Sequence, residues 1–203
     1  SRVMKYDDLK YVPLDPVDVS HFNLEPKRYV ILVTSYRDYT RSWKDEYIIQ
    51  TAEWLTQKGY MPVFVGKTDM DAEVKDSVKP KSTLPADCSA YGVDLRNKTT
   101  IPELASLMAN AAAVCGVDCG PVHLAGTTTV PIVCGYTSVS PEYRIPVRDN
   151  GKTYAIVPDL PCIGCESRWH SSFWNYENCY IKTAMCVDHL TAKRFTDILD
   201  TFL

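Results

Sequence analysis

Short apolar runs alternate with amphipathic stretches along this chain. Residues 29–34 (YVILVT), 61–65 (MPVFV), 112–117 (AAVCGV) and 130–134 (VPIVC) are apolar with no regular polar alternation. Runs of this kind are typical of strands that are buried on both faces of a parallel sheet. We therefore predict a strand at each of these four places.

Amphipathic helices are predicted between the runs. Ser42 and Asp45 have the spacing of a capping box, and apolar residues then recur at helical intervals up to Gly59. Thr100 and Glu103 form a second such pair, followed by an apolar stripe. The pattern predicts one helix after each capping box.

Two more helices complete the prediction. A tight turn at 118–121 precedes a short helix, and residues 191–202 form a final amphipathic helix. The segment between residue 141 and that final helix shows no regular period.

Strands that alternate with helices predict an α/β protein with a Rossmann-like, doubly wound parallel sheet. We expect this domain to cover residues 29–203, including a cysteine-rich appendage near its C-terminus. Residues 1–28 contain three prolines and five acidic residues without a regular period, so they are interpreted as a linker or interdomain segment.

Charge excludes several classes of protein. The chain has 203 residues, with 22 Lys plus Arg against 25 Asp plus Glu and no block of like charge. Nucleic-acid and anionic-membrane surfaces need clustered basic residues, so neither partner is expected. No apolar run approaches the ~20 residues of a membrane span, and no signal-peptide pattern is present. We predict a soluble, cytoplasmic protein.

The eight cysteines fall into two groups. Four are scattered, whereas the other four lie within 25 residues and open with a Cys-x2-Cys pair: Cys162, Cys165, Cys179 and Cys186. Four thiolates suit a tetrahedral structural zinc or iron ion, and such spacing in a cytosolic protein favours metal over disulfides. Two local disulfides or four reduced thiols are the alternatives.

Two strand-to-helix turns carry candidate binding residues. The first, 34–42, holds hydroxyl groups and the guanidinium groups of Arg37 and Arg41, which suit phosphate oxygens. In the second, 118–123, glycine permits close backbone approach and a carboxylate can accept hydrogen bonds from sugar hydroxyls. Taken singly, each has an ordinary interpretation: solvated arginines, Asp118 as a helix N-cap and His123 as a core histidine. Neither G-x-G-x-x-G nor a P-loop motif is present.

Residues 117–125 (VDCGPVHLA), followed by the strand at 130–133 and Gly135, resemble the signature of glycosyltransferase family nine, the heptosyltransferases of lipopolysaccharide synthesis. That family has Asp-Thr/Ser-Gly-x-x-His-Leu-Ala and then a strand ending in Phe-Gly-Pro-Thr. The segments 41–43 (RSW) and 94–107 also resemble family motifs in the family's order, and the likeness covers residues 29–203. Cys119, Cys134 and Tyr136 depart from the pattern.

The resemblance implies a GT-B enzyme in which two Rossmann-like domains face each other. Such an enzyme transfers a sugar from a nucleotide diphosphate sugar to an acceptor hydroxyl without a catalytic metal, and its C-terminal domain binds the donor. By position, Arg41 would contact phosphate, Asp118 the donor sugar and Asp69 the nucleoside. The family also has a similar cysteine group, which one branch uses to hold iron. The substrate-binding residues expected here are Thr34, Ser35, Arg41, Asp69, Asp118, Cys119, Gly120 and His123.

The family's acceptor domain and general base have no counterpart in residues 1–28, and the chain begins at Ser1 without Met. We therefore expect a donor-binding half that is inactive alone, with its catalytic residues unknown and a glycan or protein as acceptor. The alternative is a non-catalytic interaction or assembly domain with a structural metal site, exposing Trp169, Phe173, Trp174 and Tyr176. A GT-B epimerase or phosphorylase shares the fold but has no motif support.

Overall fold

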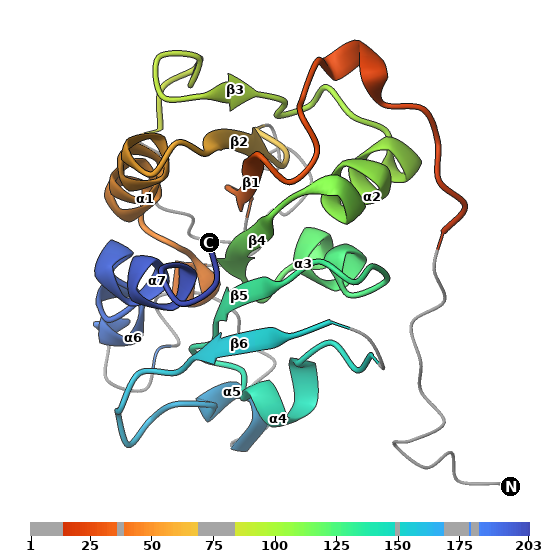
Figure 1. The fold of residues 1–203 in the computed structure, drawn as a ribbon. Helices are drawn as coiled ribbons and strands as arrows, with labels where there is room; N and C mark the ends of the chain where they lie inside the picture. Colours follow the sequence, from red (N-terminus) through yellow and green to blue (C-terminus); the bar gives the residue numbers. More distant parts are fainter. Residues whose placement is uncertain (1–13, 36–38, 69–83, 149–150, 169–178, 180–182) are drawn as a thin grey trace, which may run out of the picture.

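The computed structural model describes residues 14–35, 39–68, 84–148, 151–168, 179 and 183–203. In this part of the chain six strands form one sheet in the order β3-β2-β1-β4-β5-β6, and every neighbouring pair is parallel (Figure 1). This is the strand order of a doubly wound α/β sheet, as predicted. The strands are β1 (Tyr29–Val33), β2 (Met61–Val65), β3 (Val93–Asp94), β4 (Ala113–Val117), β5 (Ile132–Gly135) and β6 (Thr153–Ile156).

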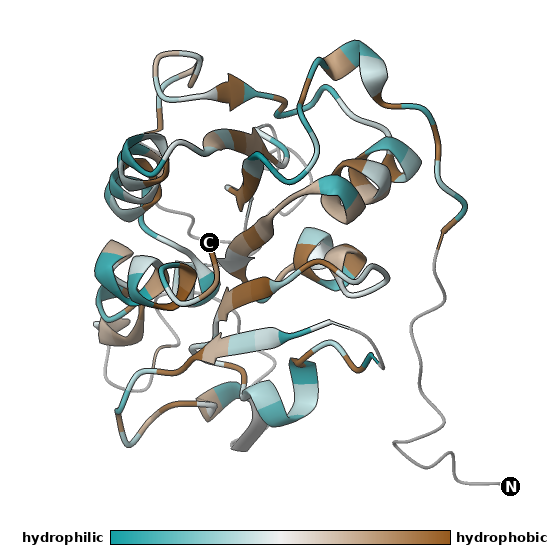
Figure 2. Cartoon of the chain, in the orientation of Figure 1, coloured by the Kyte–Doolittle hydropathy of each residue, from teal (hydrophilic) through white to brown (hydrophobic). Residues whose placement is uncertain are grey.

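Helices cover both faces of the sheet. Helices α1 (Asp45–Gln57) and α7 (Ala192–Leu199) lie on one face, and α2 (Ile101–Asn110) and α3 (Gly120–Ala125) lie on the other (Figure 1). Each face has its own apolar core, and the hydrophobic colour in Figure 2 is concentrated in the central strands. Shorter elements are the 3-10 turns η2 (Ser20–Phe22) and η3 (Tyr39–Arg41) and the helices α4 (Pro141–Arg144), α5 (Cys165–Arg168) and α6 (Met185–Asp188).

Only one of the two predicted capping boxes forms. At α2, the Thr100 hydroxyl accepts a hydrogen bond from the backbone N–H of Glu103, whose carboxylate accepts from the Thr100 N–H. The prediction for α1 was wrong, because its N-cap position is Lys44 and Ser42 instead donates its hydroxyl to the carbonyl of Tyr39, 2.7 Å away. Ser42 therefore closes the 3-10 turn that precedes the helix.

Two strands were missed by the sequence prediction. β3 has only two residues, too few for a period to show. β6 lies at the opposite edge of the sheet, where only one of its four residues is buried, so its sequence lacks the apolar run of the inner strands. β3 pairs with β2 and β6 pairs with β5, so the sheet has one more strand at each edge than predicted (Figure 1).

The segment before β1 runs along the α2 side of the domain (Figure 1). Val19, Phe22 and Leu24 pack against the core there, and the Val17 N–H donates to the Ser106 hydroxyl at 2.9 Å. The role of residues 1–28 as a linker or interdomain segment stays a prediction. Within the described residues, no helix has the length and apolar character that crossing a membrane requires.

Candidate functional site

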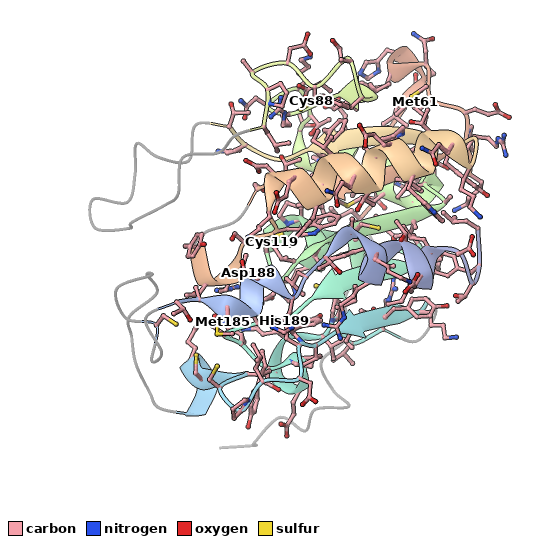
Figure 3. The ribbon with its side chains drawn as sticks, turned by 90° about the vertical axis from the view of Figure 1, so that its left-hand side faces the viewer. Met61, Cys88, Cys119, Met185, Asp188 and His189 are labelled. Carbon is pink, nitrogen blue, oxygen red and sulfur yellow. The ribbon has the colours of Figure 1, made fainter. Side chains whose placement is uncertain are left out.

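The polar residues predicted from the two turns lie where the chain leaves two neighbouring parallel strands for opposite faces of the sheet. After β1 the chain passes to α1 on one face, and after the neighbouring β4 it passes to α3 on the other. Open α/β sheets bind ligands at such a switch point, outside the carboxyl ends of the strands. Figure 3 labels Cys119 at this edge and Met61 at the opposite, amino edge.

Arg41 and Asp118 form a buried ion pair at this edge. Nη2 of Arg41 donates to Oδ2 of Asp118 at 2.5 Å and to the Asp118 carbonyl at 3.0 Å. The two side chains are only 9% and 4% exposed. The 3-10 turn that carries Arg41 is held by the Thr137 hydroxyl, which donates to the Thr40 carbonyl at 2.5 Å. A hydrogen-bonded partner of this kind is what allows a charge to be buried.

His123 binds the other oxygen of the same carboxylate. Its Nε2 lies 2.9 Å from Oδ1 of Asp118, so Nε2 carries the proton that the ionised carboxylate accepts. The imidazole is 27% exposed, and the N-cap position of α3 is Cys119. Both ordinary interpretations therefore fail: Asp118 is not the helix cap and His123 is not enclosed in the core.

Asp118 is ionised because its partners outweigh its burial. Burial alone raises the pKa of Asp118, whereas the hydrogen bond from His123 and the positive charges of Arg41 and Arg144 lower it. The balance holds the pKa below its ordinary value. The site thus has a fixed anion surrounded by cationic and hydrogen-bonding groups.

Thr34 and Ser35 lie at the exit of β1, against the exit of β2. Both the N–H and the hydroxyl of Thr34 donate to the Val65 carbonyl, at 2.9 and 3.1 Å. Gly66 has φ +134°, and a Cβ there would lie 2.9 Å from atoms of Ser35. Only glycine permits this close approach. Two other candidate residues, Arg37 of the first turn and Asp69 after β2, lie outside the described residues.

Gly120 and Cys119 lie beside the carboxylate. No atom comes within 4 Å of the position a Cβ would take at Gly120, so open space lies next to the turn. Burial raises the pKa of the Cys119 thiol to about 12, which keeps it protonated at neutral pH. Cys119 is therefore unsuited to act as a nucleophile, because the thiolate is the reactive form.

Arg144 is a residue of this site that the sequence analysis missed. It ends α4, and its charge contributes to the lowered pKa of Asp118. The segment beyond residue 141 has no hydrophobic period, and no local signal connects it to a residue 26 positions earlier. The strand order is what brings the exit of β5 beside that of β4.

The four clustered cysteines lie near one another in the structure. Burial raises the pKa of Cys186 to about 12, and the thiols of Cys179, Cys162 and Cys165 add to the effect. Sulfur atoms lie together beside Met185 in Figure 3. Among the described residues, however, no group of three or more His, Cys, Asp or Glu side chains is arranged to hold a metal ion.

The cysteine segment also touches the site. The N–H of Gly164 donates to the Thr137 carbonyl, and that of Glu166 donates to the Ser138 carbonyl, both at 2.9 Å. Because Thr137 in turn holds the turn of Arg41, the segment supports the ion pair indirectly.

The fold is that of a doubly wound α/β protein, and its polar cluster lies at the switch point, where proteins of this class bind their ligands. The chain belongs to glycosyltransferase family 9 (heptosyltransferase), whose family model matches residues 13–171. This confirms the family that the motif at 117–125 indicated.

Known relatives agree in sequence and in fold. Lipooligosaccharide heptosyltransferase 2 of Haemophilus influenzae is 27% identical over 117 residues, which are 58% of this chain and 33% of that protein. The structure of E. coli ADP-heptose lps heptosyltransferase II matches with a TM-score of 0.63 at 18% identity, covering 90% of this chain and 49% of that one. The iron-containing dodecameric glycosyltransferase TibC from enterotoxigenic E. coli H10407 matches with a TM-score of 0.65 at 15% identity, covering 94% and 49%.

At these identities the solved structures show a shared fold. The chain spans about half the length of the solved relatives, so it matches one half of a GT-B protein. What the whole relatives bind and transfer is therefore a matter for proposal here.

Proposed function

We propose that this chain is the donor-binding half of a heptosyltransferase-like glycosyltransferase, which binds a nucleotide diphosphate sugar at the carboxyl ends of β2, β1 and β4. The observation that carries this proposal is the buried cluster of Arg41, Asp118 and His123 at the switch point. Family membership supports the class of ligand.

Each residue of the cluster has a role that follows from its chemistry. The Arg41 guanidinium binds phosphate oxygens, for which its planar array of donors is suited. Asp118 accepts hydrogen bonds from sugar hydroxyls, and His123 holds its carboxylate in place. Thr34 and Ser35 line the diphosphate path, and Gly120 and Cys119 leave room for the sugar. Asp69, outside the described residues, is assigned to the nucleoside.

The reaction needs stabilisation of negative charge on the leaving group. An acceptor hydroxyl oxygen attacks the anomeric carbon while the bond from that carbon to the diphosphate oxygen breaks, and the electron pair stays on the diphosphate. Arg41 is placed to stabilise this charge from a buried, fixed position. The acceptor, a glycan or a protein, loses its hydroxyl proton to a general base that we assign to an N-terminal half outside these residues.

Calorimetric titration with ADP, GDP and UDP tests this function. At least one should bind and raise the melting temperature, with a stabilisation of about 2.7 kcal/mol when the ligand is at 100 times its Kd. Asp118→Ala and Arg41→Ala should weaken binding at least about tenfold. Arg41→Lys keeps the positive charge beside Asp118. Comparing its melting temperature and affinity with those of Arg41→Ala separates a loss of binding from a loss of stability.

Arg28→Gln provides the matched control. Arg28 is exposed at the amino end of β1, so its loss should change nucleotide affinity by less than about twofold. No response to any of the three nucleotides would contradict the proposal and would favour the assembly-domain alternative.

We further propose that Cys162, Cys165, Cys179 and Cys186 hold a structural zinc or iron ion. The proposal is supported by donor chemistry, because four thiolates suit a tetrahedral zinc or iron ion. The described side chains are not themselves arranged around one ion, and the Ala184 N–H donates to Cys179 Sγ at 3.2 Å, so binding would need these side chains to converge. The ion would fasten the segment that supports Thr137 and Ser138.

Elemental analysis of protein purified without added metal tests this. About one zinc or iron per chain is expected, reduced in Cys165→Ser and unchanged in Cys88→Ser, which removes a buried thiol outside the cluster. Much less than one ion together with four free thiols would refute the metal site.

A further inference from the structure

A cavity lies at the amino edge of the sheet, opposite the proposed donor site. It has a volume of about 430 Å³ and lies between the turn that leads into β1 and the turn that joins α1 to β2. Figure 3 labels Met61 at this edge. Cavities of this size are typical of binding sites for small organic molecules. The residues that line it include Leu24, Glu25, Arg28, Tyr60, Met61 and Pro62.

Part of the cavity wall is apolar. Leu24 and Tyr60 are half-buried there, and the side chain of Met61 is 46% exposed although Met61 begins a strand of the sheet. An apolar group of a ligand that covers these side chains removes them from water, which stabilises the complex. The wall is therefore suited to an aliphatic or aromatic group.

Arg28 is held in a fixed position at this cavity. Its Nη2 donates to the Gly59 carbonyl at 3.4 Å, and its guanidinium lies over the ring of Tyr60, 5.5 Å from the ring centroid. Gly59 follows the C-terminal end of α1, where the helix dipole favours a cation. Among the described residues no carboxylate pairs with Arg28. Its other N–H donors are available to a carboxylate of a ligand.

Glu25 lies at the other end of the turn that carries Arg28. The Arg28 N–H donates to the Glu25 carbonyl at 3.1 Å, and Lys27 between them has φ +62°. This left-handed conformation is held in place, because the Lys27 N–H donates to the Asn110 carbonyl at 2.8 Å and its Nζ donates to the Ala109 carbonyl at 3.0 Å. The backbone of the turn is therefore fixed against α2.

The two charges of this turn do not neutralise each other. In the part of the chain that the structure describes, neither Glu25 nor Arg28 has an ion-pair partner, and the Arg28 guanidinium is directed towards Gly59 and Tyr60. The cavity thus has one acidic and one basic residue beside an apolar wall. A small zwitterion with an apolar group complements all three features.

We propose that this cavity binds a free α-amino acid with an apolar side chain. Arg28 binds the carboxylate through its forked donors, and Glu25 binds the ammonium group. The apolar side chain packs on Tyr60 and Met61. This site is separate from the cluster at the carboxyl ends of the strands, so the inference does not rest on the proposed donor function.

Calorimetric titration with L-leucine, L-phenylalanine, 3-phenylpropanoate and 2-phenylethylamine tests the site. The last two probes share the aromatic group of phenylalanine, but one lacks the ammonium group and the other lacks the carboxylate. At least one of the two amino acids should bind, and L-phenylalanine, if it binds, should bind about tenfold more tightly than either analogue. Arg28→Gln and Glu25→Gln should each weaken amino-acid binding by roughly fivefold to tenfold.

Glu142→Gln is the matched control, because Glu142 is exposed on α4 at the opposite edge of the sheet. Its amino-acid affinity should stay within about twofold of that of the wild type. The melting temperatures of the free variants should lie within about 2 °C of the wild type, since the replaced side chains are exposed. In amide NMR spectra the amino acid should shift Arg28, Gly59 and Met61 and leave Asp118 unchanged.

Three results would overturn the inference. They are no saturable binding of either amino acid up to about 10 mM, binding of 3-phenylpropanoate as tight as that of L-phenylalanine, and an amino-acid affinity that is unchanged in Arg28→Gln. None of them bears on nucleotide binding, which the ADP, GDP and UDP titrations measure at the other edge of the sheet. The failure of this inference is therefore distinguishable from a failure of the proposed function.

Discussion

At the scale of single residues, two glycines differ in what requires them: one is needed for the folded structure and the other for ligand binding. Gly66 has a positive φ and faces Ser35 at a distance that excludes a side chain, whereas Gly120 faces open space. The first glycine is required by the folded chain itself. The second is required only if a ligand occupies the space beside it.

Gly120→Ala should therefore leave the melting temperature of the free protein within about 2 °C of the wild type and weaken nucleotide diphosphate sugar binding by about tenfold or more. Gly66→Ala should lower the stability of the free protein by about 1–3 kcal/mol, through strain and the clash with Ser35. Thermal melts with and without nucleotide sugar measure both effects. A Gly120→Ala variant with unchanged affinity would contradict the position of the sugar.

Contacts between residues that are far apart in the sequence could not be predicted from it. The sequence indicates Asp118 and His123 because they share one motif, and Arg41 because it follows a strand. It does not indicate that Arg41 and Asp118, 77 positions apart, form an ion pair. Arg144 was missed for the same reason, since only the strand order brings it to the site.

At the scale of elements, a buried ion pair attaches the segment before β3 to the edge of the sheet. Asp94 and Arg96 form a buried pair that also binds the backbone of the segment before β3: Asp94 accepts from the Cys88 N–H, and Arg96 donates to the carbonyls of Pro85 and Ala86. The pair thus attaches residues 84–88 to the edge of the sheet.

The Asp94–Arg96 pair should make the free energy of unfolding depend on pH. Burial raises the pKa of Asp94, but the hydrogen bonds from Arg96 and Cys88 lower it to about 2, against an ordinary value of 3.8. Because the folded pKa is the lower one, the contribution is present above about pH 4 and is lost as the pH falls towards 2. The stability difference between wild type and Asp94→Asn should shrink by roughly 1–2 kcal/mol over that range, as followed by urea unfolding. A difference independent of pH would contradict it.

The cap of α2 gives a second prediction at this scale. Thr100→Ala removes the reciprocal hydrogen bonds with Glu103 and should cost about 1 kcal/mol, or roughly 2–4 °C in melting temperature. Thr99→Ala is the neighbouring control. Equal melting temperatures for both variants would mean that the capping box does not stabilise the helix.

Elements with a strong local pattern were predictable, and the others were not. Strands β1, β2 and β4 are buried on both faces and are visible as apolar runs, and α2 has its cap. Ser42 misled the prediction for α1, because a serine near a helix start can equally close a preceding turn. The edge strand β6 lacks an apolar run because much of it faces solvent.

At the scale of the whole molecule, the alternation of strands and helices was sufficient to predict the doubly wound sheet, and this architecture places the site. Turns that leave adjacent strands β1 and β4 for opposite faces meet at one edge, whatever their separation in sequence. The family match agrees with this arrangement over most of the chain.

The most direct test of the central claim is to map where a nucleoside diphosphate binds, from backbone amide NMR shifts of the chain during titration with ADP, GDP and UDP. The account predicts that the amides of Thr34, Ser35, Arg41, Asp118 and Gly120 shift together with one binding constant, while those near Arg28 and Met61 stay unchanged. Shifts confined to the amino edge around Arg28 and Met61, or no shifts with any of the three nucleotides, would contradict it.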